Sequence, residues 1–137
     1  MIKIITGQTG EGKTKKMLET ANSMLPTLKG NAIYIDTSNH LRLTLSHKIR
    51  LIEANDLPLK SCSSFIAFLC GIISANHDIE VVFIDELFKL TQCSLDEIAT
   101  LFEEIKKLSE LHHIEFFIGT SCSKNDLPQH LTPYLIA

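Results

Sequence analysis

The segment Gly7-Gln-Thr-Gly-Glu-Gly-Lys-Thr14 joins a short apolar run, Ile2–Thr6, to a stretch with helical spacing, Thr14–Leu25. The apolar run predicts a buried strand, and the stretch after the glycines repeats apolar residues every three or four positions, as a helix face does. Glycines let a backbone fold so that several N–H groups point inward, and a following helix aims its partly positive N-terminus at the same spot. The segment therefore predicts a phosphate-binding loop within a strand–loop–helix unit.

The loop follows the spacing G-x-x-x-x-G-K-T, in which each fixed position has a chemical role. We expect Lys13 to reach the β- and γ-phosphates of a nucleoside triphosphate and to act in catalysis, and Thr14 to offer its hydroxyl to Mg²⁺. Lys15 and Lys16 follow directly and either attract phosphate or lie solvated on the helix. The predicted nucleotide-binding residues are Gly7, Gln8, Thr9, Gly10, Glu11, Gly12, Lys13, Thr14 and Lys15.

Two acidic residues stand at the end of the run Glu80–Asp85, whose β-branched core predicts a fully buried strand. Phosphoryl transfer needs a second Mg²⁺ anchor and a group that positions the nucleophile. We expect Asp85 to bind Mg²⁺ together with Thr14, and Glu86 to orient or polarise the attacking water as a catalytic residue. Asp36, which ends another predicted strand, is an alternative water-activating carboxylate.

Strands and helices alternate along the whole chain. The predicted strands are Ile2–Thr6, Asn31–Asp36, Lys48–Ala54, Glu80–Asp85, Ile114–Gly119 and Tyr134–Ile136, and the predicted helices are Thr14–Leu25, Ser61–Asn76, Ser94–Leu111 and Asp126–Leu131. Ser94 and Glu97 have the spacing of a capping box. The alternation predicts an α/β three-layer αβα sandwich with a mostly parallel sheet, in a single domain over residues 1–137.

The sheet leaves two points open. About a dozen residues without a clear helix, Thr37–His47, precede the strand Lys48–Ala54. Because parallel crossovers usually need a dozen or more residues, commonly a helix, we expect an antiparallel edge hairpin here. Thr120 and Ser121 follow the strand Ile114–Gly119, at the edge where α/β sheets bind ligands. A hydroxyl there would either sense a γ-phosphate or belong to an ordinary turn.

The 137 residues carry a net charge of −3, with a pI of about 6.0. A general nucleic-acid-binding protein shows a basic face or a high pI, so nucleic acid is not indicated. The longest apolar run, Phe65–Ile73, is too short for a membrane-spanning helix, which needs about 20 residues, and signal-peptide features are missing. The cysteines Cys62, Cys70, Cys93 and Cys122 have no C-x-x-C spacing. We therefore expect reduced thiols in a cytoplasmic protein, with Cys70 in the core.

Together, Gly7–Thr14 and Val81–Glu86 resemble the Walker A and Walker B motifs of P-loop NTPases. The closest division has an extra strand between the two motif strands and a catalytic glutamate after the Walker B aspartate. RecA-like and AAA-type ATPases belong to it, and the chain is also similar to very small bacterial P-loop proteins labelled PilT-like. The resemblance implies Mg·ATP bound at Gly10, Gly12, Lys13 and Thr14, with Asp85 on the metal and Glu86 as the catalytic acid.

We expect slow ATP hydrolysis that drives or regulates a protein partner or a homo-oligomer; a nucleotide-controlled binding module without significant hydrolysis is the alternative. A GTPase is a further alternative, because Ser123-Lys-Asn-Asp126 echoes the guanine-reading N/T-K-x-D motif, although Phe88 stands at the glycine position of D-x-x-G. A small-molecule kinase is another alternative, although such enzymes usually close an arginine-rich lid and the arginines here are Arg42 and Arg50. Either arginine could instead act as an arginine finger across a subunit interface.

Overall fold

A computed structural model describes residues 1–7, 12–37, 45–55, 57, 59–122 and 124–136. Five strands form one sheet in the order β1-β5-β4-β2-β3, and all its strand pairs are parallel. The strands are β1 (Ile2–Thr6), β2 (Asn31–Asp36), β3 (Ile49–Glu53), β4 (Ile79–Ile84) and β5 (Glu115–Thr120). The helices are α1 (Lys13–Met24), α2 (Cys62–Ala75), α3 (Leu87–Thr91) and α4 (Leu95–His112), with 3₁₀ turns at Leu25–Thr27, Lys124–Asp126 and Gln129–Tyr134.

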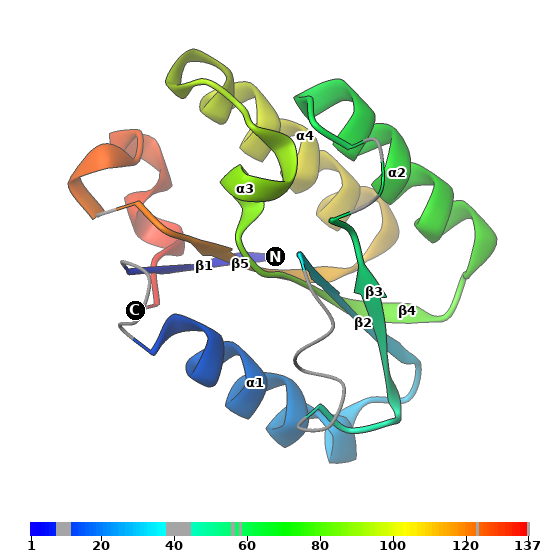
Figure 1. The fold of residues 1–137 in the computed structure, drawn as a ribbon. Coiled ribbons are helices and arrows are strands. Elements are labelled where there is room, and N and C mark those ends of the chain that lie inside the picture. Colours follow the sequence, from blue (N-terminus) through cyan, green and yellow to red (C-terminus); the bar gives the residue numbers. More distant parts are fainter. Residues whose placement is uncertain (8–11, 38–44, 56, 58, 123, 137) are drawn as a thin grey trace.

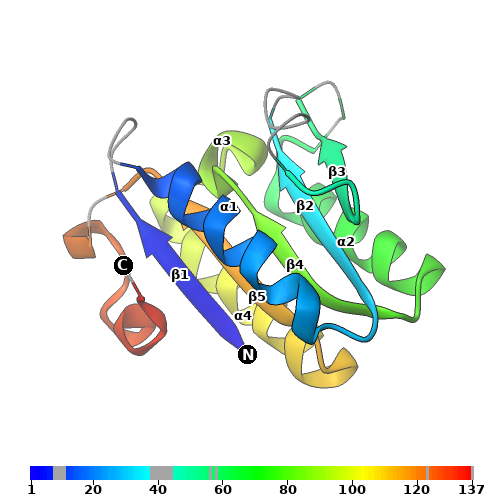
Figure 2. The same ribbon diagram turned by 90° about the horizontal axis from the view of Figure 1, so that it is seen from below.

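Helices cover both faces of the sheet, with α1 on one face and α2 and α4 on the other (Figures 1 and 2). Alternate residues of β4 serve the two sides. Val81 and Phe83 belong to the core cluster that includes Met17 of α1, whereas Val82 and Ile84 belong to the cluster formed with α2 and α4. A strand buried on both faces needs a continuous apolar run. The layers are compatible with the predicted three-layer sandwich.

Most predicted elements are present, and their ends differ from the predicted ones by at most one residue. The capping box at the start of α4 is confirmed, since the Ser94 backbone N–H donates to Glu97 Oε1 at 3.1 Å. The predicted strand Tyr134–Ile136 is reduced to a single parallel bridge between Leu135 and Ile4. The predicted helix Asp126–Leu131 is wrong, because 3₁₀ turns take its place, and the short helix α3 was not expected.

The predicted antiparallel edge hairpin is wrong. β3 pairs with β2 in parallel, with Ala32 beside Ile49 and Asp36 beside Glu53. Residues 37–48 connect the two strands, and that length already meets the minimum of about a dozen residues for a parallel crossover. Segment 38–44 lies outside the described residues. The length of the connection was therefore a better guide to the direction of β3 than the missing helical sequence pattern.

The expectations for the cysteines also need correction. Cys62 and Cys93 form a disulfide with Cα atoms 6.0 Å apart, although 31 positions separate them in the chain. Sequence spacing could not reveal this, because the pair forms only when the start of α2 packs beside the α3–α4 turn. Cys70 is exposed rather than buried. It lies one position beyond Leu69, off the buried stripe that α2 presents to the sheet through Phe65, Leu69 and Ile73.

Candidate functional site

One edge of the sheet collects most of the residues to which the sequence assigns chemistry. Strand β5 lies between β1 and β4, so one strand separates the two strands that precede the motifs, as the resemblance implies. Because all strands are parallel, their carboxyl ends share an edge with the start of α1 and the start of α3 (Figure 2). Lys13, Thr14, Asp85, Glu86 and Ser121 meet there through the contacts described below.

The glycine loop is described only at its two ends. Gly12 is the N-cap of α1 and has a left-handed backbone, with φ 82° and ψ 13°. A Cβ at Gly12 would meet nothing within 4 Å, so backbone conformation rather than space favours glycine there. The structure also describes Gly7. The roles predicted for Gln8, Thr9, Gly10 and Glu11 fall outside the described residues.

Lys13 is buried at the site, with a side chain that is 3% exposed. Its Nζ donates to Glu86 Oε1 and, at 2.9 Å, to Ser121 Oγ. The Ser121 hydroxyl in turn donates to Glu86 Oε2, which closes a three-membered network. Lys89 adds a second ammonium 4.0 Å from Glu86 Oε2. The lysine predicted to bind phosphate therefore contacts the glutamate predicted to position water.

This network determines the charge of Glu86. Burial by itself would raise the pKa of this carboxyl, but hydrogen bonds from Lys13 and Ser121 and the charges of Lys13 and Lys89 outweigh it. The net result is a pKa below the ordinary value of 4.5. Glu86 has a left-handed backbone, with φ 58° and ψ 52°, at the N-cap of α3. We expect Glu86 to be a carboxylate at neutral pH.

Asp85, the preceding residue, lies in a different environment. It is 1% exposed, and its Oδ2 accepts hydrogen bonds from Thr14 Oγ1 and from the Tyr34 hydroxyl, both at 3.1 Å. Within the described part of the chain, its Oδ1 has no hydrogen-bond partner. Burial raises the pKa of Asp85, and the hydrogen bonds from Thr14 and Tyr34 offset only part of that rise. A buried carboxylate oxygen without a partner is costly unless a cation or donor reaches it.

The donor set around Asp85 fits Mg²⁺. This hard cation takes oxygen ligands and is commonly held by one or two carboxylates, substrate phosphates and water. Asp85 and Thr14 supply a carboxylate and a hydroxyl in mutual contact. In the described ranges, the structure contains no group of three or more His, Cys, Asp or Glu residues that could hold a metal ion.

Tyr34 is a site residue that the sequence prediction missed. It lies on β2 with 0% exposure, and its ring stacks on Phe83 with centroids 5.7 Å apart. Burial, followed by the charge of Asp85, raises the pKa of Tyr34 well above its ordinary value of 10.0, so the phenol stays protonated and donates. In the sequence Tyr34 resembles any aromatic core residue of a strand. Its position two residues before Asp36, on the same face of the strand, was the available signal.

Gly119 was also missed as a residue of the site. A Cβ at this position would lie 2.6 Å from Met17 Sδ, 3.2 Å from Asp85 Oδ1 and 3.6 Å from Lys13 Cδ. The backbone of β5 therefore approaches the Asp85 carboxylate more closely than a larger residue would allow. A glycine inside a strand often marks such a close approach, which was the signal in the sequence.

Several other predicted residues have further contacts or exposure of their own in the described chain. Asp36 is 2% exposed, and its Oδ1 accepts from the Thr37 backbone N–H at 2.7 Å. Thr120 is fully buried, and its hydroxyl lies 3.4 Å from Cys122 Sγ. Lys15 is exposed on α1. Arg50 is exposed on β3, and Arg42 lies outside the described residues, as does Ser123 of the guanine-like segment.

Comparison with protein-family models gives no match, and comparison with curated proteins gives none either. In the described residues, no helix combines the length and apolar character needed to cross a membrane.

Proposed function

We propose that this chain is a P-loop NTPase that binds Mg·ATP and hydrolyses it slowly. The observation that carries the proposal is the convergence of four side chains at one sheet edge. Lys13 and Thr14, which follow the glycine loop, contact Glu86 and Asp85, respectively. The position of β5 between β1 and β4 adds support, because the resembling division has a strand there. The RecA-like assignment is part of the same proposal.

Each residue has a distinct task in this scheme. Lys13 and the backbone N–H groups at the start of α1 neutralise and orient the β- and γ-phosphates. Thr14 and Asp85 hold Mg²⁺, and the ion supplies neutralisation of the charge that develops on the phosphate oxygens. Glu86 orients the attacking water. The Ser121 hydroxyl contacts both Lys13 and Glu86. In the proposed scheme it senses a bound γ-phosphate through these two residues.

The resting contacts support slow turnover. Glu86 is engaged by Lys13, Ser121 and Lys89, so it cannot orient water until triphosphate draws Lys13 away. The same observation favours the second candidate, a nucleotide-controlled binding module in which the network switches without much hydrolysis. In either form we propose a protein partner or a second copy of the chain as the responding element. A cytoplasmic location stays a prediction from the sequence.

A thermal-shift panel with ATP, GTP and their diphosphates, with and without Mg²⁺, tests binding. A ligand at 100 times its Kd adds about 2.7 kcal/mol to the stability of the folded state, which raises Tm by roughly 10 °C for a chain of this length. Lys13→Ala should lose most of that rise. Lys16→Ala removes the same charge from an exposed position on α1 and should keep it.

Absence of any purine triphosphate effect on folded protein would refute nucleotide binding. Steady-state phosphate release then separates the two candidates, because an ATPase releases phosphate continuously and a binding module does not. A larger shift with GTP than with ATP would move the assignment to a GTPase. Product analysis with small-molecule acceptors would expose a kinase.

A further inference from the structure

Cys62 and Cys93 form a covalent link away from the site described above. Cys62 is the first residue of α2, and Cys93 lies between the end of α3 and Ser94, the N-cap of α4. Their Cα separation of 6.0 Å is typical of a disulfide. Both residues are partly exposed rather than fully enclosed. In the cytoplasmic location that the sequence predicts, disulfides are usually transient, catalytic or redox-sensing.

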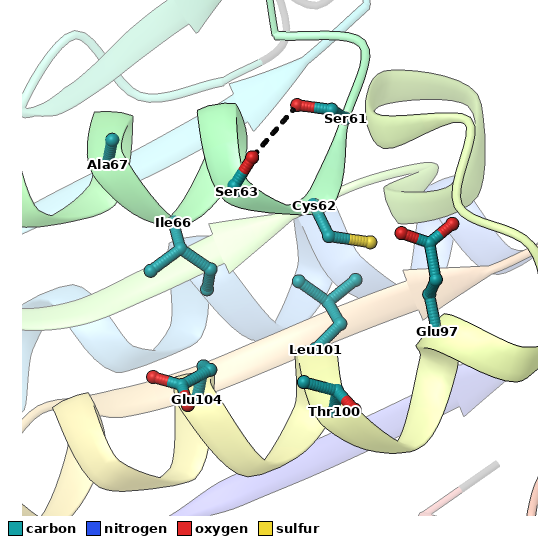
Figure 3. Close-up of a pocket in the computed structure, with 9 residues that line it drawn as sticks. All are labelled: Ser61, Cys62, Ser63, Ile66, Ala67, Glu97, Thr100, Leu101 and Glu104. Atoms are coloured by element: carbon teal, nitrogen blue, oxygen red, sulfur yellow. Dashed lines mark hydrogen bonds between the residues drawn. The ribbon is translucent and has the colours of Figure 1, made fainter.

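A pocket of about 490 Å³ leads to Cys62 from the surface between α2 and α4. Figure 3 shows the Cys62 side chain leaving the start of α2 in the direction of Glu97, with Ile66 and Leu101 farther along the groove. Glu104 lines the same pocket. Of the two disulfide-bonded cysteines, Cys62 lines this pocket. A small molecule in the pocket therefore has a route to the Cys62 sulfur.

The position of Cys62 also suits a reacting sulfur. The backbone N–H groups in the first turn of a helix favour negative charge, and α2, which begins at Cys62, is 14 residues long. The Ser61 side chain accepts the Ser64 N–H at 3.1 Å, so Ser61 caps the helical turn that Cys62 begins. A thiolate, rather than a thiol, attacks disulfides.

We infer that Cys62 and Cys93 form a thiol–disulfide exchange site for small organic disulfides that enter through this pocket. The Cys62 thiolate attacks one sulfur of the small disulfide, which forms a mixed disulfide at Cys62 and releases one small thiolate. The Cys93 thiolate then attacks Cys62 Sγ, closes the protein disulfide and releases the second small thiolate. Two electrons pass from the cysteine pair to the small disulfide, and the two cysteine protons end on the released thiols.

The charges that line the pocket select among such disulfides. Besides Cys62 itself, the ionisable residues that line the pocket within the described chain are Glu97 and Glu104. Both are acidic and oppose the thiolate that the start of α2 favours, so an incoming cation offsets their effect. Opposite charge raises the local concentration of a ligand. Cystamine, which is cationic, should therefore react severalfold faster than glutathione disulfide, which is anionic, at low ionic strength. Added salt should shrink the difference.

The experiment uses the reduced full chain with Cys70→Ser and Cys122→Ser, so that only the pair can react, and wild-type protein in parallel. After timed exposure to cystamine or glutathione disulfide, free thiols are alkylated and counted by mass spectrometry. We expect loss of both thiols, a Cys62–Cys93 cross-linked peptide, and full reversal by reduced glutathione without denaturant. With Cys93→Ser added, a mixed disulfide should accumulate at Cys62. With Cys62→Ser added instead, capture at Cys93 should be severalfold slower.

Four results would overturn the inference. Both thiols could stay free in excess small disulfide, or the cross-link could form only after denaturation; either would show that the pair does not exchange in the folded protein. Equal capture at Cys93 and Cys62 would exclude the pocket as the entry route. Glutathione disulfide reacting as fast as cystamine at low salt would remove the proposed charge selection. The wild-type time course keeps the test decisive if a serine variant folds poorly.

Discussion

Replacing Glu86 by Gln tests whether the resting network opposes nucleotide binding. The Glu86 side chain is 13% exposed and that of Lys13 is 3% exposed, so their contact is largely shielded from water. The amide that replaces the carboxylate can still accept a hydrogen bond from Lys13 but no longer neutralises its charge. We expect Glu86→Gln to be less stable without nucleotide and to bind Mg·ATP more tightly, because binding removes Lys13 from a weaker partner.

The magnitude follows from the contact that is weakened. Lys13 stays charged in the variant, so both contacts fall in the range of about 1.5–3 kcal/mol for hydrogen bonds to charged groups, with the carboxylate at its upper end and the amide at its lower end; the difference is about 1–2 kcal/mol. For a chain of this length that corresponds to a fall in Tm of about 5 °C. Because about 1.4 kcal/mol is a factor of ten in affinity, the nucleotide Kd should fall about tenfold. Turnover should fall by about 10²–10⁴ if Glu86 positions the water.

Calorimetric titration gives the Kd, thermal unfolding gives the Tm, and phosphate release gives the turnover. Glu104→Gln is the matched control, since it removes the same charge from a pair with Lys107 whose side chains are 43% and 71% exposed. Exposed pairs contribute about 0–1 kcal/mol, so this variant should change little. An unchanged Tm with wild-type or weaker affinity in Glu86→Gln would refute the competition between Glu86 and nucleotide. Normal turnover would remove its catalytic role.

Three further predictions concern the Asp85 side of the site. Tyr34→Phe removes one of the two hydrogen-bond donors to the Asp85 carboxylate. About fivefold more Mg²⁺ should then be needed for half-maximal nucleotide binding. A titration of nucleotide binding with Mg²⁺ that matches the wild type would contradict this prediction. Gly119→Ala places a Cβ 2.6 Å from Met17 Sδ and should destabilise the fold by about 1–3 kcal/mol in urea unfolding, and wild-type stability would contradict it. The folded-state pKa of Asp85 is raised above 3.8, so Asp85 contributes stability below pH 3.8 and loses this contribution as pH rises through the folded pKa. Asp85→Asn should therefore flatten the plot of unfolding free energy against pH in that range. Glu86, whose pKa is lowered below 4.5, contributes stability above pH 4.5 and loses it as pH falls. Identical pH profiles of Asp85→Asn and wild type would contradict the assignment.

The arrangement of the core could be predicted because its signals are local. Strand β4 carries a continuous apolar run, and α4 begins at a capping box, so periodicity and end signals agree. The direction of β3 and the pairing of Cys62 with Cys93 could not be predicted in the same way. Both depend on which segments become neighbours after packing, and nothing within either segment records that choice.

The residues of the candidate site also divide into those that could be predicted from the sequence and those that could not. Lys13, Thr14, Asp85 and Glu86 carry charges or hydroxyls at motif spacing, and the structure brings them together, whereas their roles stay predictions. Tyr34 and Gly119 support the site from inside strands, where an aromatic residue or a glycine is usually explained by packing.

The neighbouring carboxyls Asp85 and Glu86 differ because the backbone turns left-handed at Glu86 and carries its side chain to Lys13. Burial raises the pKa of Asp85, while the cations around Glu86 lower its pKa. Two titratable groups pushed in opposite directions are suited to different tasks. Asp85 is destabilised as an anion until a cation arrives, which suits a metal ligand. Glu86 already has its cation, so it becomes available to water only when triphosphate takes Lys13, and in the proposed scheme this order makes hydrolysis conditional on a loaded site.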